Sequence, residues 1–309
     1  MKISVIGAAG YVGSNVAIML AVKGLCDEIV LVDPFKPNLV VHLGMDTTTG
    51  ISEIGVNVHE GEYPDIKDSN IVIVAAGAAQ GLIASRMEML PKNLPIIKEI
   101  AGHIKEFAPD SIVLTATNPV DPLNYAMYQF TGFDRRKVIG YTLNDSTRFK
   151  EMVAQELGHK PCEVDGFVFG EHGESQVQAF STIRINGKPV VFTEATKKKI
   201  KDRVPLILKT YEELQTGRTA GVTSGYGTSK IVNAIVNNTN ETLSSSAVLD
   251  GEYGQKNISM GVPLVLGSGG IHAIRELELA DDEKAGFANT VKVLSAAMRQ
   301  VDEFVKENK

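Results

Sequence analysis

Three residues have types and spacing that suit proton transfer beside a bound carboxylate. Asp145 and Arg148 lie three positions apart in the string NDSTRF, and His172 lies in the string GEHG. Residues three apart on a helix share a face, so this carboxylate and guanidinium would point into one space. A histidine held by a carboxylate can give or take a proton while the neighbouring guanidinium binds an acid. The combination predicts acid–base chemistry on a small organic acid.

A glycine-rich turn opens the chain. Gly7, Gly10 and Gly13 form a GxxGxxG string between an expected strand and an expected helix. Glycines let the backbone approach a pyrophosphate, which would then sit on the N-terminus of that helix. Asp33 ends the next expected strand 20 residues after Gly13, where an acid accepts hydrogen bonds from ribose hydroxyls and repels a 2′-phosphate. The spacing favours NAD over NADP, although Lys36 adds a cation that could tolerate the phosphate.

The first half of the chain alternates short apolar runs with helical stretches, which are expected over 11–23, 93–107 and 122–131. The expected strands are Ile3–Gly7, Ile29–Asp33, Val56–Glu60, Ile71–Gly77, Ile112–Asn118 and Val138–Tyr141. Continuous apolar runs are typical of parallel strands buried on both faces, whereas Val56–Glu60 alternates as an edge strand does. This pattern predicts an α/β fold, with a doubly wound parallel sheet of the Rossmann type in residues 1–143.

Residues 144–309 are expected to form an α+β substrate domain. A hairpin is expected at 182–191, with Asn186-Gly187 as its turn. Strands are expected near 242–249 and 258–266, and helices over about 194–214 and 281–306. A bend rich in Gly, Thr and Ser over 216–229 would precede a helix that ends near Asn237. The boundary near residues 141–145 would give the two domains one continuous cleft.

Bulk composition excludes several classes of protein. The chain has 309 residues, 43% hydrophobic and 22% charged, with a net charge of −6 and one basic cluster at Lys197–Lys201. These values describe a globular protein and argue against nucleic acid as a partner. Two cysteines and six scattered histidines show no metal-ligand spacing. The longest apolar run, Ile71–Ala79, is too short to cross a membrane, and without a signal peptide we expect a cytoplasmic protein.

Two further segments should border the ligand crevice. Asn118 ends the fifth expected strand, and in an open α/β sheet the carboxyl ends of strands face the crevice. Asn118 would then touch both the nicotinamide region and a substrate hydroxyl. Residues 77–86 are small and glycine-containing at the start and end in the cation Arg86, which is the pattern of a closing lid.

The order and spacing of these elements resemble the lactate/malate dehydrogenase family over essentially the whole chain. The matching elements are Gly7–Gly13, Asp33, Ala76-Gly77 with Gln80 and Arg86, Asn118–Asp121, Asp145 with Arg148, Gly170–Ser175 and Gly261–Gly267. The resemblance implies an NAD-dependent L-2-hydroxy acid dehydrogenase that assembles as a homodimer or homotetramer. A non-enzymatic NAD-binding protein would keep the glycine turn but would not need the whole polar set, and an NAD-dependent glycosidase would need a metal site.

The resemblance also implies a role for each polar residue. His172 would be the proton relay, and Asp145 would hold its ring in one tautomer. Arg148 would bind the substrate carboxylate through two parallel hydrogen bonds. Arg86 would polarise the substrate carbonyl as negative charge develops on its oxygen, and Asn118 would help to place the reacting carbon.

Gln80 bears on which acid is used. It lies six residues before Arg86, where the malate branch of the family has an arginine and the lactate branch has a glutamine. A neutral amide would leave a second substrate carboxylate unpaired in a closed site, so Gln80 favours lactate and pyruvate. Ala247, at a position where lactate enzymes resemble one another in having threonine, keeps malate open. The apolar stretch 81–84 would either suit a larger 2-oxo acid, such as 2-oxoisocaproate, or pack against the closed domain. The 140–145 loop is one residue shorter than in lactate enzymes, which also weakens the assignment to lactate.

Overall fold

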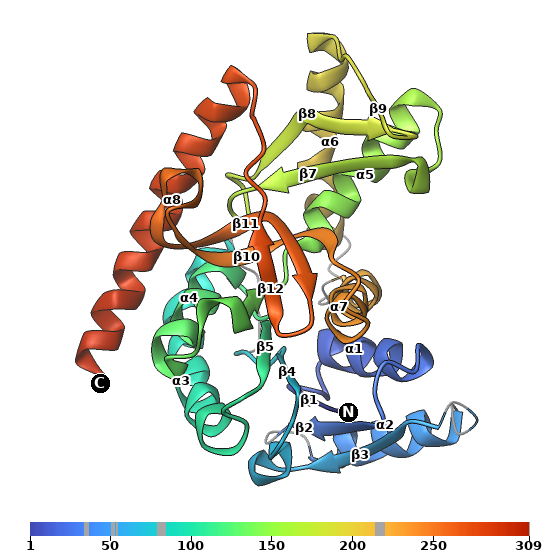
Figure 1. Cartoon of the computed structure of the whole chain (residues 1–309), viewed down its shortest axis with the longest axis vertical. Helices are drawn as coiled ribbons and strands as arrows, with labels where there is room; N and C mark the ends of the chain where they lie inside the picture. Colours follow the sequence, from blue (N-terminus) through green and yellow to red (C-terminus); the bar gives the residue numbers. More distant parts are fainter. Residues whose placement is uncertain (34–36, 51–52, 54, 79–84, 214–219, 309) are drawn as a thin grey trace.

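The computed structural model describes residues 1–33, 37–50, 53, 55–78, 85–213 and 220–308. Within them, one sheet of nine strands runs in the order β12-β11-β10-β6-β5-β4-β1-β2-β3 (Figure 1). Its strands are β1 (Lys2–Ile6), β2 (Glu28–Val32), β3 (Asn57–Gly61), β4 (Ile71–Val74), β5 (Ile112–Thr115), β6 (Val138–Gly140), β10 (Glu241–Asp250), β11 (Lys256–Gly267) and β12 (Gly270–Ile274).

The six strands of the first half are parallel, as the apolar runs predict. Every residue of β4 and β5 is buried, because helices cover both faces of the sheet. The alternating strand β3 lies at the sheet edge and pairs only with β2 among the described strands. The strand order reverses between β4 and β1, and in doubly wound sheets such a switch point opens the ligand crevice. The predicted α/β fold with a Rossmann half is confirmed.

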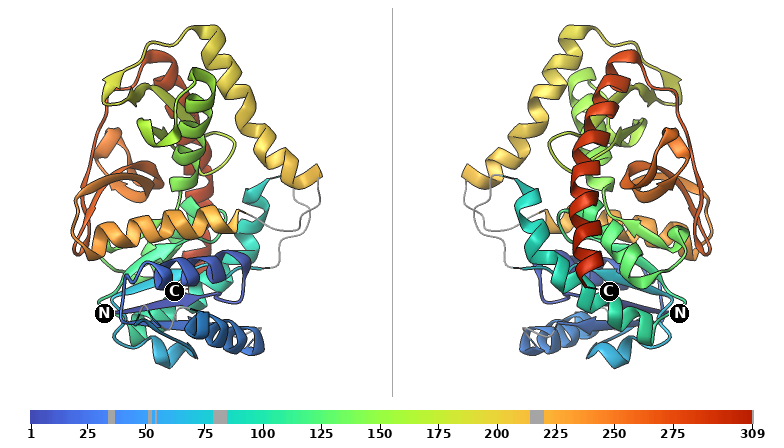
Figure 2. Two further views of the ribbon diagram at one scale, coloured as in Figure 1. Left: turned by 90° about the vertical axis from the view of Figure 1, so that its right-hand side faces the viewer. Right: turned by 90° about the vertical axis from the view of Figure 1, so that its left-hand side faces the viewer.

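The helices pack against this sheet or against one another. They are α1 (Tyr11–Val22), α2 (Pro37–Gly50), α3 (Leu90–Phe107), α4 (Val120–Thr131), α5 (Leu143–Leu157), α6 (Glu194–Glu213), α7 (Gly221–Val236) and α8 (Asp281–Glu307). Helix α1 packs against α7, and α3 packs against α4. Figure 1 shows these two pairs on opposite sides of β1, β4 and β5, and Figure 2 shows α8 running along one side of the molecule.

A second, smaller sheet belongs to the second half. It consists of β7 (Val164–Phe169), β8 (Val177–Ile185) and β9 (Lys188–Pro189), all antiparallel. The predicted Asn186-Gly187 turn is confirmed, with positive φ angles of 49° and 76°. Its apolar face packs on α5, where the rings of Phe149 and Phe180 meet edge to face at 5.0 Å between centroids. This packing fixes the helix that carries Asp145 and Arg148.

The structure corrects one expectation in the second half. The bend expected over 216–229 is helical from Gly221 onward, as the start of α7. A Cβ atom on Gly225 would lie 2.6 Å from the carbonyl oxygen of Asn15, so glycine lets the backbones of α7 and α1 touch. Tertiary packing here outweighs the low helix propensity of glycine. Helix α2 and the strands β7 and β12 were not expected from the sequence.

The proposed division at residues 143/144 crosses a continuous sheet. Strand β10 pairs with β6 through Ser246 with Gly140 and Ala247 with Ile139. The second half therefore supplies antiparallel strands to the sheet of the first half, and the division stays a prediction. No helix in the described part of the chain is long and apolar enough to cross a membrane.

Candidate active site

The glycine turn between β1 and α1 requires glycine at two of its three glycine positions. Gly7 has a φ of +85°, and a Cβ atom there would lie 2.4 Å from the Ala76 nitrogen. A Cβ atom on Gly13 would lie 2.2 Å from the Gly7 carbonyl oxygen, whereas one on Gly10 would lie a more tolerable 3.2 Å from that oxygen. The first turn of α1 contains no acidic residue, and its N-cap makes no side-chain hydrogen bond. The turn therefore leaves a helix N-terminus available to an anion.

Asp33 lies beside this turn, at the carboxyl end of β2. The Ala9 backbone N–H donates to its Oδ2 at 3.1 Å. This contact ties the carboxylate to the turn and leaves it at the position where a ribose would follow a pyrophosphate. The residues present therefore fit a dinucleotide.

Asn118 follows β5, at the carboxyl end of the sheet, where doubly wound folds bind their ligands. Asn93, on α3, donates through Nδ2 to the Asn118 carbonyl at 2.7 Å and accepts from the Ala78 N–H at 2.8 Å. The Thr117 hydroxyl donates to the Ala76 carbonyl at 2.7 Å. The buried Oδ1 of Asn118 has no hydrogen-bond partner among the described residues. An orphaned buried acceptor at the carboxyl end of a strand suits a group that contacts a ligand.

His172 and Asp145 form a buried pair, although 27 residues separate them. The His172 Nδ1 atom lies 2.5 Å from Asp145 Oδ2, and the two residues are 8% and 5% exposed. Burial raises the pKa of Asp145, but His172, Arg86 and Arg148 more than offset it, so the pKa falls below its usual 3.8. Burial lowers the pKa of His172 below 6.5, although Asp145 opposes this. Burial thus favours the neutral form of the ring, and the contact of Nδ1 with Asp145 orients the ring so that Nε2 lies on its other side.

Two arginines complete the cluster. Arg148 Nη1 lies 3.7 Å from Asp145 Oδ1, one helical turn along α5. Arg86 begins the short 3-10 helix η3 (Arg86–Met89), and its Nη1 donates to the His172 carbonyl oxygen at 2.8 Å. The four polar residues expected to act together therefore lie together, and they come from two different halves of the chain.

Asp121 is a neighbour that the sequence did not reveal. It lies in the first turn of α4, and its carboxylate accepts from the His172 backbone N–H at 2.7 Å and from the Ser246 hydroxyl at 2.6 Å. Burial raises the pKa of Asp121 to about 7, although both hydrogen bonds lower it. The string NPVD marked Asp121 as part of the family pattern, but its partners lie 51 and 125 residues away.

Two residues invoked for substrate choice are not placed beside this cluster. Gln80, with the rest of 79–84, lies outside the described residues. Ala247 is fully buried in β10 and pairs with Ile139 and Met260. Its neighbour Ser246 points to Asp121, so strand alternation turns Ala247 to the other face of the sheet. The expectation that Ala247 bears on the substrate therefore finds no structural support.

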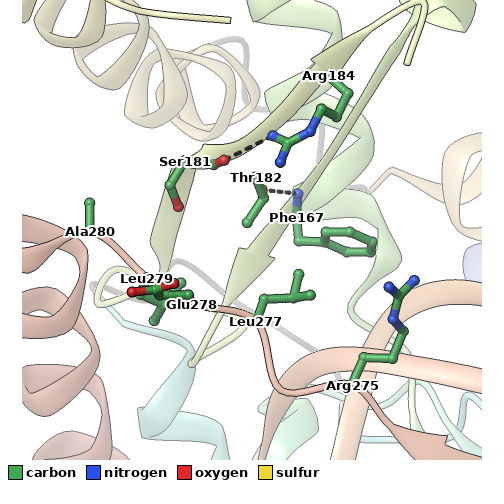
Figure 3. A pocket seen from close by; sticks show the side chains of 9 residues that line it. All are labelled: Phe167, Ser181, Thr182, Arg184, Arg275, Leu277, Glu278, Leu279 and Ala280. Carbon is green, nitrogen blue, oxygen red and sulfur yellow. Dashed lines mark hydrogen bonds between the residues drawn. The ribbon is translucent and has the colours of Figure 1, made fainter. Parts of the chain in front are cut away.

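A cavity of about 580 Å³ lies elsewhere, between β8 and residues 275–280 (Figure 3). None of the residues expected to do chemistry lines it. Arg184 is the cation on its upper wall in Figure 3, and its Nη1 donates to the backbone carbonyls of Ser181 and Ile183. Its guanidinium is thus partly engaged by its own strand. The described part of the chain also holds no group of three or more potential metal ligands.

Comparisons with known proteins agree with this arrangement. Residues 1–140 match the NAD binding domain of lactate/malate dehydrogenase, and residues 142–305 match the alpha/beta C-terminal domain of the same family. L-lactate dehydrogenase 2 of Enterococcus faecalis is 35% identical, with 96% of each chain covered. A malate dehydrogenase of Halobacterium salinarum is 34% identical, with 97% of this chain and 99% of the relative covered.

A solved structure shows the same likeness. The lactate dehydrogenase of Cryptosporidium parvum, complexed with lactic acid and nicotinamide adenine dinucleotide, has a TM-score of 0.90 at 27% identity. The alignment covers 97% of this chain and 98% of that one. The fold, the nucleotide turn and both domain matches therefore lead to one conclusion: this chain belongs to the lactate/malate dehydrogenase family of NAD-dependent 2-hydroxy acid oxidoreductases.

Proposed function

We propose that His172 exchanges the proton in this reaction and that Asp145 orients it. The observation that carries the proposal is the buried 2.5 Å contact between the two side chains, with Arg86 and Arg148 beside them. Asp145 holds Nδ1, so Nε2 is the atom that gives a proton to a substrate carbonyl oxygen during reduction. Asp145 also stabilises the imidazolium that must form before that transfer.

The two arginines divide the recognition of the substrate. Arg148 projects from the same helical face as Asp145 and binds the carboxylate that every 2-oxo acid carries. Arg86 donates a hydrogen bond to the backbone carbonyl of His172, which places its guanidinium beside the histidine. From there it polarises the carbonyl group of the substrate. Gly7, Gly10, Gly13, Asp33 and Asn118 hold the cofactor. NAD supplies the hydride chemistry when it is bound.

The substrate that we propose is a monocarboxylic 2-oxo acid, with pyruvate and lactate as the natural pair. Both described arginines serve groups that all 2-oxo acids share, so a second carboxylate would need a third cation. The residue six before Arg86 is the neutral Gln80. An unpaired carboxylate in a closed site costs several kcal/mol. Malate dehydrogenase is the alternative, because relatives of both kinds are equally similar, and an L-2-hydroxyisocaproate-type enzyme is a third reading.

Substrate preference provides the test. We expect wild-type kcat/KM to be higher for pyruvate or 2-oxoisocaproate than for oxaloacetate. Gln80→Arg should move the ratio of pyruvate to oxaloacetate at least ~10-fold toward oxaloacetate, because it supplies the missing partner charge. The measurement is NADH oxidation with all three acids in both proteins. Gln80→Asn is a matched control that stays neutral and should leave the order of preference unchanged.

A wild-type preference for oxaloacetate would reject the lactate assignment. Another residue would then supply the third cation, and malate would become the substrate. The proton-transfer proposal would survive that result, because His172 and Asp145 serve both reactions.

We also propose that the enzyme is a cytoplasmic homodimer or homotetramer. Large apolar side chains are exposed along three helices: Ile18 at 37% and Val22 at 50% on α1, Met45 at 64% on α2, and Val222 at 56% and Tyr226 at 52% on α7. Helix α1 contacts both α2 and α7, so these side chains lie on adjoining elements. A second copy covering them would remove this apolar area from water.

Solution mass tests that assembly. Light scattering should give two or four times the 33.3 kDa chain mass, and Met45→Lys with Val222→Lys should shift the population toward the single chain. Val191→Lys is the matched control, because Val191 is 98% exposed and lies on none of the three helices. A 33.3 kDa species at micromolar concentration would contradict the proposal.

A further inference from the structure

The first turn of α5 is held by its neighbours rather than by a cap. Its N-cap residue Thr142 makes no side-chain cap hydrogen bond. Instead, three consecutive side chains contact three different parts of the molecule. Asn144 donates to the Ser224 hydroxyl of α7 at 3.1 Å, Asp145 contacts His172, and Ser146 accepts from the Val168 N–H of β7 at 2.9 Å. The placement of Asp145 therefore depends on the two tethers that flank it.

Tyr141 completes the tether to α7. Its hydroxyl contacts Asn144 Oδ1 and lies 3.1 Å from the Thr223 carbonyl oxygen, so one proton faces two acceptors. Tyr141, Asn144 and Ser224 are 4%, 5% and 7% exposed, so water cannot replace these contacts. A Cβ atom on Gly227 would lie 2.2 Å from the Tyr141 hydroxyl oxygen, so only glycine leaves room for the phenol.

The other side of α7 packs against α1, the helix that follows the glycine turn. Helices α1 and α7 lie side by side in both views of the molecule (Figures 1 and 2). The Lys23 ammonium lies 4.3 Å from the centre of the Tyr226 ring, and Gly225 faces the Asn15 backbone. Helix α7 is thus held against α1, and it can anchor the first turn of α5.

We propose that Tyr141 and Asn144 are positioning residues, which hold Asp145 and Arg148 in place by anchoring the first turn of α5 to α7. The inference rests on the proposed roles of Asp145 and His172. Removing the phenol hydroxyl leaves Asn144 Oδ1 without its donor in a buried place, and this favours a shift of the turn. A shift of about 1 Å at such a turn lowers turnover by up to ~100-fold, even though Tyr141 touches no reacting atom.

The proton affinity of His172 reports the shift directly. Asp145 raises the pKa of His172, whereas burial, Arg86 and Arg148 lower it. Further charged groups near this histidine are Asp121, which accepts from its backbone N–H, and Glu171 and Glu174, which flank it in the chain. A looser contact between Asp145 and His172 therefore lowers the pKa of the imidazole. The reduction of an oxo acid needs the imidazolium. In a pH profile, the rate of reduction should therefore begin to fall at a lower pH.

The experiment compares Tyr141→Phe with Tyr125→Phe. Tyr125 is a matched control: it is 2% exposed, donates to Asp302 of α8 at 3.1 Å and accepts from Gln129 of α4 at 2.8 Å, so its hydroxyl makes neither of these contacts with α5 or α7. We expect Tyr141→Phe to lower kcat/KM for pyruvate ~10-fold, to change KM for NADH less than ~2-fold, and to lower the pKa of His172 in an NMR titration. Tyr125→Phe should change none of these. Ser224→Ala should act in the same direction as Tyr141→Phe.

Different results would contradict the positioning role and the proposed function. An unchanged NMR pKa of His172 in Tyr141→Phe, or equal effects in Tyr125→Phe, overturns the positioning role. The His172 resonance is assigned by its loss in His172→Gln, so this readout needs no turnover. Full activity in His172→Gln would instead overturn the proposed function.

Discussion

Replacing His172 with glutamine is expected to lower kcat for pyruvate reduction by roughly 10²–10⁴-fold, because general acid catalysis contributes about that much. Glutamine fills the space and can still accept a hydrogen bond, but no atom of its side chain titrates near neutral pH. The affinity for NADH should change less than ~2-fold, since the glycine turn and Asp33 lie in another part of the crevice. Stopped-flow turnover and NADH fluorescence titration measure the two quantities.

The pH profile sharpens this prediction. Reduction needs a protonated ring, and burial holds the pKa of His172 below its usual 6.5. Pyruvate reduction by the wild type should therefore fall as pH rises through that pKa, whereas lactate oxidation, which needs the neutral ring, should rise. In His172→Gln, neither the fall of pyruvate reduction nor the rise of lactate oxidation with pH should remain. A residual activity with the wild-type pH profile would mean that another group moves the proton.

Replacing Arg148 with lysine is expected to lower kcat/KM for pyruvate by roughly 10²–10³-fold, which corresponds to about 3–4 kcal/mol. Lysine keeps the charge but has a single ammonium, so it cannot form two parallel hydrogen bonds to a carboxylate. Most of the loss should be in KM for the oxo acid, with KM for NADH nearly unchanged. Steady-state kinetics with each substrate varied in turn separates the two effects.

The matched control is Arg299→Lys, which makes the same change at an exposed arginine on α8 and should leave kcat/KM within ~2-fold. Arg148 also lies 3.7 Å from Asp145, so a structural role must be excluded. If Arg148→Lys weakens NADH and pyruvate equally, or lowers Tm without a selective rise in KM for pyruvate, the arginine supports the fold rather than the substrate.

Local patterns in the sequence determined most of the Rossmann half. Four- and five-residue apolar runs predicted the parallel strands, because a strand buried on both faces has no polar side to show. The Asn186-Gly187 turn was predictable for a similar reason, since its positive φ angles restrict the residue types that fit. Glycine spacing located the nucleotide turn, where a Cβ atom at Gly7 or Gly13 would overlap backbone.

Residue types and the family resemblance predict the polar set Arg86, Asp145, Arg148 and His172. Their residue types alone do not predict that the four side chains lie close together. Only Asp145 and Arg148 were tied by helical spacing, whereas 86 residues separate Arg86 from His172. The tertiary structure supplies the contacts, because α5, which follows β6, and the His172 segment, which follows β7, meet where Asp145 contacts His172.

Partners far apart in the sequence were decided by the tertiary structure alone. Asn93 carries no local signal, and the NPVD string marks Asp121 without its partners, because their hydrogen bonds join them to residues 25 and 51 positions away. Helix α7 is the clearest case: its glycines predict a bend, yet at Gly225 and Gly227 they make room for the Asn15 backbone and the Tyr141 hydroxyl. A residue's own sequence neighbours set its backbone preferences, but the space around it is set by elements that folding brings from elsewhere in the chain.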